Sequence, residues 1–256
     1  MDVNMTMIAV ALSAVSIVAG FIDSIAGGGG LLLMPALLVA GVPPQTVLGT
    51  NKFASTIGTS VAFVNFVRHK KVVWRIAAIG ILFSLAGSLL GSKTILIFQN
   101  ELVGKIIVGL LPLSVLSLFL QKKRRASVDD ISPSDLYMKV PPICLMIGFY
   151  DGFFGPGTGS FLIIALYLLV GLDLIHASAT AKAFNLASNI GALSVFLIEG
   201  KVIFLLGLPL AIANVAGNYL GSSLAIKMGN STVRGFLFIS LSILFISLFW
   251  KYFIDG

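Results

Sequence analysis

The sequence predicts an all-α polytopic membrane protein built from two related halves. Of its 256 residues, 57% are hydrophobic and only 11% are charged, whereas about a quarter of the residues of a soluble domain are charged. Long apolar stretches recur from one end of the chain to the other, and the motifs of the first half return in the second half in the same order. These three observations exclude a water-soluble enzyme.

The apolar stretches mark the expected membrane segments. A bilayer core of ~30 Å takes about 20 helical residues to cross. Two stretches, with 11 and 13 residues, are too short, and each follows a glycine-rich break, at 27–30 and at 155–159. With these two half-helices included, we expect about 8 to 10 transmembrane segments. The stretches are residues 5–26, 31–41, 46–67, 72–92, 102–120, 140–154, 160–172, 177–198, 202–226 and 235–253.

The two halves share matched motifs in the same order. The segment GFIDSIAGGGG matches GFYDGFFGPGT at an offset of 128, which superposes Asp23 on Asp151. The segment GTNKFAS matches ATAKAFN at an offset of 130, which superposes Lys52 on Lys182. We infer an internal duplication. The expected organisation is a first transmembrane repeat at 1–120, a basic cytoplasmic linker at 121–139 and a second transmembrane repeat at 140–256.

The basic loops set the orientation. Clusters of lysine and arginine at 68–75 and 122–125 are typical of cytoplasmic loops. If each short stretch counts as a pass, the repeats are inverted and the N-terminus lies outside. If each broken pair crosses once, the repeats are parallel, and the loop charges of the second half do not decide between the two. We prefer the inverted arrangement, because the N-terminus has no basic residue before the first apolar stretch and duplicated transporters are often built that way.

One pattern of motifs spans the chain. A glycine run opens a short apolar segment ending in proline and glycine, AGGGGLLLMPALLVAGVPP, and GTNKFAS and a basic turn follow. The second half carries GPGTGSFLIIALYLLVGLDLIHASATAKAFNLASN. This pattern resembles the TauE/SafE family of sulfite and organosulfonate anion permeases. The resemblance implies a secondary carrier of sulfur-containing or organic anions, without fixing which anion.

Two lysines lie at equivalent positions, each a few residues inside an apolar stretch. Lys52 and Lys182 have polar neighbours that include Asn51, Ser55 and Asn185. An isolated ammonium in lipid costs on the order of 3 kcal/mol, and a bound anion would offset that cost. We therefore expect these side chains to face an anion site. The alternative is that the lysines extend to the membrane interface.

The two short helices begin at glycine-rich turns. Free backbone N–H groups and the positive end of the helix dipole at such a start bind oxyanions, and glycine lets a ligand approach the backbone closely. Hydroxyl donors are added in the second half only. The alternative is close helix packing through small residues. The expected ligands from these turns are Gly28, Gly29, Gly30, Gly157, Thr158, Gly159 and Ser160.

Two aspartates stand just before the breaks. Asp23 and Asp151 are each expected to carry a proton or to form a fixed pair with a lysine or with free N–H groups. If Asp23 pairs with Lys52 and Asp151 with Lys182, protonation of the aspartates frees the lysines for an anion. That arrangement provides a route to proton coupling.

The expected function is secondary transport of a small anion by alternating access, at a site near the midplane between the glycine breaks. An anion channel is the nearest alternative, and a membrane enzyme or assembly scaffold is a more distant one. The expected location is a cell membrane, and the expected partners are the anion and the lipid bilayer, with a homo-oligomer left open. No catalytic residue, cofactor, metal or nucleic acid is expected, because the sequence has a single cysteine and no catalytic motif.

Overall fold

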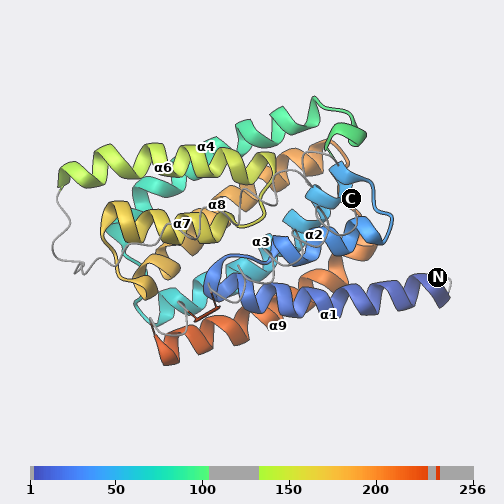
Figure 1. Ribbon diagram of the computed structural model, residues 1–256, viewed down its shortest axis with the longest axis horizontal. Coiled ribbons are helices and arrows are strands. Elements are labelled where there is room, and N and C mark those ends of the chain that lie inside the picture. The colour runs from blue at the N-terminus through green and yellow to red at the C-terminus, as the bar shows by residue number, and fades with distance from the viewer. Residues whose placement is uncertain (1–2, 104–132, 230–234, 237–256) are drawn as a thin grey trace, which may run out of the picture.

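The computed structural model describes residues 3–103, 133–229 and 235–236, and every regular element in those ranges is a helix (Figure 1). The predicted segments at 102–120 and 235–253 and the linker at 121–139 lie largely outside the described residues. The helices are α1 (Val3–Ala26), α2 (Gly30–Val39), α3 (Pro44–Arg68), α4 (Trp74–Leu96), α6 (Pro133–Phe153), α7 (Thr158–Ala165), the π-helical turn η3 (Leu166–Val170), α8 (Leu174–Ile198) and α9 (Phe204–Met228).

Four of the described helices are long and apolar enough to cross a membrane. They are α4, α8, α9 and the part of α1 at Met7–Ala26. The more polar α3 and α6 have 25 and 21 residues, which at 1.5 Å per residue is also enough to cross the hydrocarbon core. The apolar helices Gly30–Val39 and Thr158–Val170 are shorter. The described part of the chain is thus all-helical, with several helices apolar enough to cross a membrane.

Helix α6 differs most from the sequence prediction. The apolar stretch begins at residue 140, but the helix already begins at Pro133. Proline is well tolerated in the first turn of a helix. Apolarity alone therefore places the start of this helix too late.

Each repeat begins with a helical hairpin bent at a glycine break. Gly27 follows α1 with a φ of 78°, and Gly155 follows α6 with a φ of 98°, a left-handed conformation that ends helices. Gly29, at the start of α2, lies against the last turns of α1. In the second hairpin, the Tyr150 hydroxyl of α6 donates a hydrogen bond of 2.7 Å to the carbonyl of Pro156. Helix α2 thus starts beside the end of α1, and α7 starts beside the end of α6.

The long helices of the two halves pack in matching ways. Helix α1 packs along α9 at one edge of the molecule and α6 packs along α4 at the opposite edge, with α3 and α8 between them (Figure 1). Glycines let the edge helices approach closely: a Cβ atom on Gly217 of α9 would lie 2.0 Å from the carbonyl oxygen of Ile17, and one on Gly91 of α4 would lie 2.0 Å from that of Phe149. Each edge therefore combines the first long helix of one half with the last long helix of the other half.

The helices run in two opposite directions. The contacts show that α1 and α3 run parallel to α9, and that α6 and α8 run parallel to α4. Helices α3 and α8 run antiparallel, because Gly49 lies against Phe196 and Lys52 donates a hydrogen bond to Asn189. Helices α1, α3 and α9 therefore run one way, and α4, α6 and α8 run the other way.

Two apolar cores flank a polar layer. One core joins the starts of α6 and α8 to α7, η3 and the turn between α3 and α4. The other joins α2 to the starts of α1, α3 and the end of α8. Buried polar side chains of α1, α3, α6 and α8 lie between them, and they include Asn51, Lys52, Asp151, Lys182 and Asn189. The glycine breaks end in this layer.

Candidate functional site

The two glycine breaks touch each other at the centre of the molecule. A Cβ atom on Gly27 would lie 2.2 Å from the carbonyl carbon of Gly159, and one on Gly159 would lie 2.4 Å from the Cα atom of Gly27. The Ser160 hydroxyl of the second repeat donates a hydrogen bond of 2.5 Å to the carbonyl of Ala26 in the first. The small size of glycine is therefore what lets the two backbones come together.

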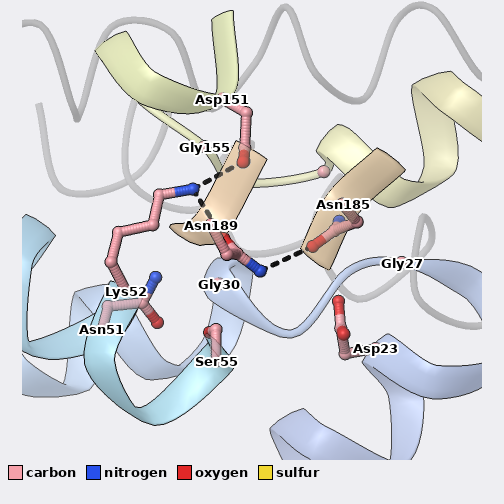
Figure 2. Close-up of a pocket in the computed structure, with 11 residues that line it drawn as sticks. Asp23, Gly27, Gly30, Asn51, Lys52, Ser55, Asp151, Gly155, Asn185 and Asn189 are labelled. Carbon is pink, nitrogen blue, oxygen red and sulfur yellow. Dashed lines mark hydrogen bonds and ion pairs between the residues drawn. The ribbon is translucent and has the colours of Figure 1, made fainter. Parts of the chain in front are cut away.

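A cavity lies beside this crossing. It is small and is lined by polar side chains and glycine backbone. Figure 2 shows the side chains of α1, α3, α6 and α8 directed toward it from several sides. The lining residues are Asp23, Gly27, Gly30, Asn51, Lys52, Ser55, Asp151, Gly155, Gly157, Asn185 and Asn189.

The first ion pair of the site joins Lys52 to Asp151. The Nζ atom of Lys52 lies 2.7 Å from Oδ1 of Asp151, and both side chains are only 3% exposed. The same Nζ donates a hydrogen bond of 2.9 Å to the side-chain oxygen of Asn189, and the Ser188 hydroxyl donates one of 2.5 Å to Oδ2 of Asp151. Both carboxylate oxygens of Asp151 therefore have a close donor, and Figure 2 shows the one from Lys52.

The second ion pair joins Lys182 to Asp23. The Nζ atom of Lys182 lies 2.8 Å from Oδ2 of Asp23 and also donates to the backbone carbonyl of Asp23. The remaining donors are more distant, with the Thr59 hydroxyl 3.4 Å from Oδ2 and the Gly29 N–H nitrogen 3.5 Å from Oδ1. Asp23 is 15% exposed and Lys182 only 1%, so the aspartate side chain stands at the cavity and the lysine behind it.

The pairing within each repeat that the sequence suggested is wrong. Asp23 and Lys52 belong to the first repeat, but each pairs with a residue of the second. The cause is the crossing of the breaks, which sets the end of α1 against α8 and the end of α6 against α3. The two ion pairs therefore bind the repeats to one another, and alignment of the repeats alone does not reveal this.

The structure brings together eight of the predicted site residues around the cavity. They are Asp23, Gly30, Asn51, Lys52, Ser55, Asp151, Gly157 and Asn185. The other six, Gly28, Gly29, Thr158, Gly159, Ser160 and Lys182, do not line it.

The predicted hydroxyl donors of the second break are used elsewhere. The Thr158 hydroxyl donates a hydrogen bond of 2.6 Å to the carbonyl of Gly155, and the Ser160 hydroxyl donates to Ala26. Both side chains donate to backbone oxygens at the helix breaks. Thr158 and Ser160 therefore stabilise the crossing and are not available as ligands in this state.

Three cavity residues were not among the predicted site residues: Gly27, Gly155 and Asn189. Gly27 and Gly155 are the turn residues of the two breaks, and their positions in the glycine-rich motifs were a usable signal. Asn189 lies one helical turn after Asn185 on α8, and its side-chain N–H donates a hydrogen bond of 2.7 Å to the Asn185 side-chain oxygen. A spacing of four residues places both on one helix face.

The site offers hydrogen-bond donors to a ligand. Gly30 and Gly157 bring the starts of α2 and α7 to the cavity, and neither start has a side-chain cap. Helix starts present N–H groups and a partial positive charge. Asn51 is 5% exposed, and its side-chain oxygen has no hydrogen-bond partner in the described part of the chain. No cluster of metal-ligating side chains occurs among the described residues.

Comparison with known proteins identifies a family of membrane transporters. The model of a family described as sulfite exporter TauE/SafE matches residues 12–248. The chain is 36% identical over 228 residues to the probable membrane transporter protein ORF9 of Sinorhizobium sp, covering 89% of this chain and 87% of that protein. It is 36% identical over 223 residues to the probable membrane transporter protein YfcA of Escherichia coli (strain K12), covering 86% and 81%. A probable membrane transporter protein of Haemophilus influenzae is 35% identical over 237 residues, covering 91% of each chain. No solved structure matches the chain.

Proposed function

Because the chain belongs to the TauE/SafE family of membrane transporters, we propose that it is a secondary carrier of a small anion. The anion is sulfite, an organosulfonate or another sulfur-containing or organic anion, and the carrier works by alternating access. The observation that supports this most strongly is the small polar cavity, in which the buried Lys52 meets the starts of two half-helices. Broken helices whose positive ends meet at the midplane are a known way to bind anionic groups in transporters.

The charges of the site favour an anion that arrives with a proton. Two lysines and two aspartates give the empty site a net charge of zero. An added anion leaves one uncompensated negative charge in a place where burial of charge is costly. Protonation of one aspartate removes that charge, so proton coupling follows from the composition of the site.

The proposed topology is a pair of inverted repeats, at 1–120 and 140–256, in a cell membrane. The opposite directions of α1 and α6, and of α3 and α8, support inversion. Together with the apolar stretches that the sequence places at 102–120 and 235–253, this gives about 8 to 10 membrane segments, counting the two hairpins. The basic turn at 68–75 and the linker at 121–139 then face the cytoplasm. One repeat rocking against the other about the glycine crossing exposes the cavity to each side in turn.

Isothermal titration of the detergent-purified protein with sulfite, sulfate, thiosulfate, sulfoacetate, taurine and acetate tests the site. We expect saturable binding of at least one sulfur oxyanion and a loss of affinity of ~10-fold or more in Lys52→Ala, because the ammonium is a direct partner of the anion. Lys93→Ala is the matched control, because Lys93 is exposed on α4. Absence of binding, or equal loss of affinity in both variants, contradicts the proposal.

A further inference from the structure

We propose that the two aspartates have different roles: Asp23 takes up the coupling proton, and Asp151 stays ionised as the fixed partner of Lys52. The inference rests on the proposed function, because it names the proton site of the same carrier. It depends on differences between two ion pairs that occupy equivalent positions in the two repeats.

Asp151 is enclosed, with a close partner at each carboxylate oxygen. Its Oδ1 atom lies 2.7 Å from Nζ of Lys52, and its Oδ2 atom lies 2.5 Å from the Ser188 hydroxyl. The side chain is 3% exposed. A proton on Oδ1 has to displace the Lys52 ammonium, and a proton on Oδ2 requires the Ser188 hydroxyl to turn to its other acceptor, the carbonyl of Asn185 at 3.0 Å.

Asp23 is more exposed than Asp151 and has fewer close donors. Its Oδ2 atom pairs with Lys182 at 2.8 Å, but its Oδ1 atom has only the Gly29 N–H nitrogen at 3.5 Å, a distance at the limit of hydrogen bonding. Figure 2 shows the side chain at the edge of the cavity with its carboxylate directed inward. With 15% of the side chain exposed, one oxygen can accept a proton from the cavity while the other keeps its lysine.

The sequence explains this difference between the two pairs. The position equivalent to Ser188 in the first repeat is Gly58, which has no hydroxyl to offer Asp23. A Cβ atom on Gly58 would lie 2.0 Å from the side-chain oxygen of Asn214 in α9, so a side chain there requires Asn214 to move. The second aspartate thus gained a short hydrogen bond that packing against α9 denies to the first.

Few titratable groups of the described residues lie near Asp23. Lys182 of α8 contacts it directly, and Lys52 of α3 and Asp151 of α6 lie across the cavity. Helices α2 and α7 contain no titratable side chain. Those of α9, one tyrosine and one lysine, are exposed. The other titratable groups of α3 and α8 lie near helix ends, away from the cavity.

Protonation of Asp23 makes the site ready for the anion. The carboxylate separates Lys182 from the cavity, so a neutral Asp23 leaves the charge of Lys182 uncompensated and raises the net charge of the site from zero to +1. A monovalent anion returns it to zero. One proton bound from the bulk enters with one anion and leaves with it, so the inference predicts an electroneutral cycle with one proton per monovalent anion.

Infrared difference spectroscopy on the purified protein tests the division of roles without any substrate. Acidification should produce the carbonyl band of a protonated buried carboxyl group in the wild type and in Asp151→Asn, and the band should be absent from Asp23→Asn. The inference is overturned if the band is lost in Asp151→Asn and kept in Asp23→Asn, or if neither substitution removes it.

Milder variants answer the same question if either asparagine variant fails to fold. Thr59→Val removes the hydroxyl beside Asp23 and should shift the midpoint pH at which the band appears. Ser188→Ala removes the hydroxyl beside Asp151 and should leave that midpoint unchanged. The reverse result contradicts the inference.

A second measurement separates the inference from the proposed function. Proton uptake is followed with a pH indicator when sulfate or methanesulfonate, which do not titrate near neutral pH, is added to weakly buffered protein. We expect methanesulfonate binding to take up one proton in the wild type and none in Asp23→Asn. Binding with unchanged uptake in Asp23→Asn refutes the inference and leaves the anion site intact. Absence of binding by any anion of the calorimetric panel counts against the proposed function, and the infrared bands still decide which aspartate titrates.

Discussion

The Lys52–Asp151 pair and the Lys182–Asp23 pair stand at equivalent points of the two repeats, but their surroundings differ. The first is sealed, with both side chains 3% exposed and a serine completing the carboxylate. The second has a carboxylate 15% exposed, with its other donors at 3.4 and 3.5 Å. The charges occupy aligned positions in the two halves of the sequence, whereas neighbouring residues such as Gly58 and Ser188 determine how firmly each charge is held.

The glycine crossing is shared by both pairs, and its loss should have the largest effect. Gly27→Ala places a Cβ atom 2.2 Å from the backbone of Gly159 and forces an L-residue to a φ of 78°. The conformation alone costs about 1–2 kcal/mol, and the clash adds several more because backbone cannot yield. We expect a large fall in thermal stability in detergent and loss of anion binding.

Gly41→Ala is the matched control for this substitution. Gly41 has a φ of 81°, and a Cβ atom there would have nothing within 4 Å. This variant should lose only the conformational term, about 1–2 kcal/mol. Equal destabilisation of the two variants would show that the backbones do not cross as described.

The sealed pair should be the more sensitive of the two to removal of one partner. Asp151→Asn leaves the ammonium of Lys52 buried without its carboxylate, which typically costs about 3–5 kcal/mol. The double variant Lys52→Met, Asp151→Asn should recover much of this loss, because no buried charge is left without its partner. Combining Lys52→Met with Asp23→Asn should give no such recovery. Recovery with Asp23 instead of Asp151 contradicts the crossed pairing.

The open pair should tolerate the same change better. Asp23→Asn removes a partly hydrated carboxylate, and Lys182 keeps the backbone carbonyl of Asp23 as a partner. A hydrogen bond to a charged group contributes roughly 2 kcal/mol, so we expect a smaller fall in unfolding temperature than for Asp151→Asn under the same conditions. A larger fall would show that the two pairs are not sealed and open as inferred.

The smallest effect is expected away from the site, at the start of α8. Asp173 caps this helix through the N–H groups of Ile175 and His176. Burial tends to raise the pKa of Asp173, but hydrogen bonds and the charge of His176 outweigh it and hold the pKa below its ordinary value of 3.8. Asp173→Ala should cost about 1 kcal/mol near neutral pH. Because the folded pKa is lowered, the difference from wild type should shrink as the pH falls below about 4. A difference independent of pH contradicts this.

The sequence revealed the parts of the site that depend on repetition and on the cost of burying charge. The equivalence of Lys52 with Lys182 and of Asp23 with Asp151 located the polar layer, and the two glycine-rich motifs located the helix breaks. Partners could not be read from the sequence, because they depend on how two hairpins cross in space. Thr158 and Ser160 illustrate this: a hydroxyl near a helix start can serve a ligand or a backbone carbonyl, and only the packing decides.

Counterflow in proteoliposomes tests the account most directly. Vesicles containing the purified protein are loaded with an excess of the unlabelled anion that binds best in calorimetry and are then diluted into a trace of the same anion carrying an isotope label. The account predicts transient accumulation of label in wild-type vesicles, saturable with anion concentration and absent in Lys52→Ala. Flux that rises linearly without accumulation would identify a channel, and accumulation that survives Lys52→Ala would contradict a site built around this lysine.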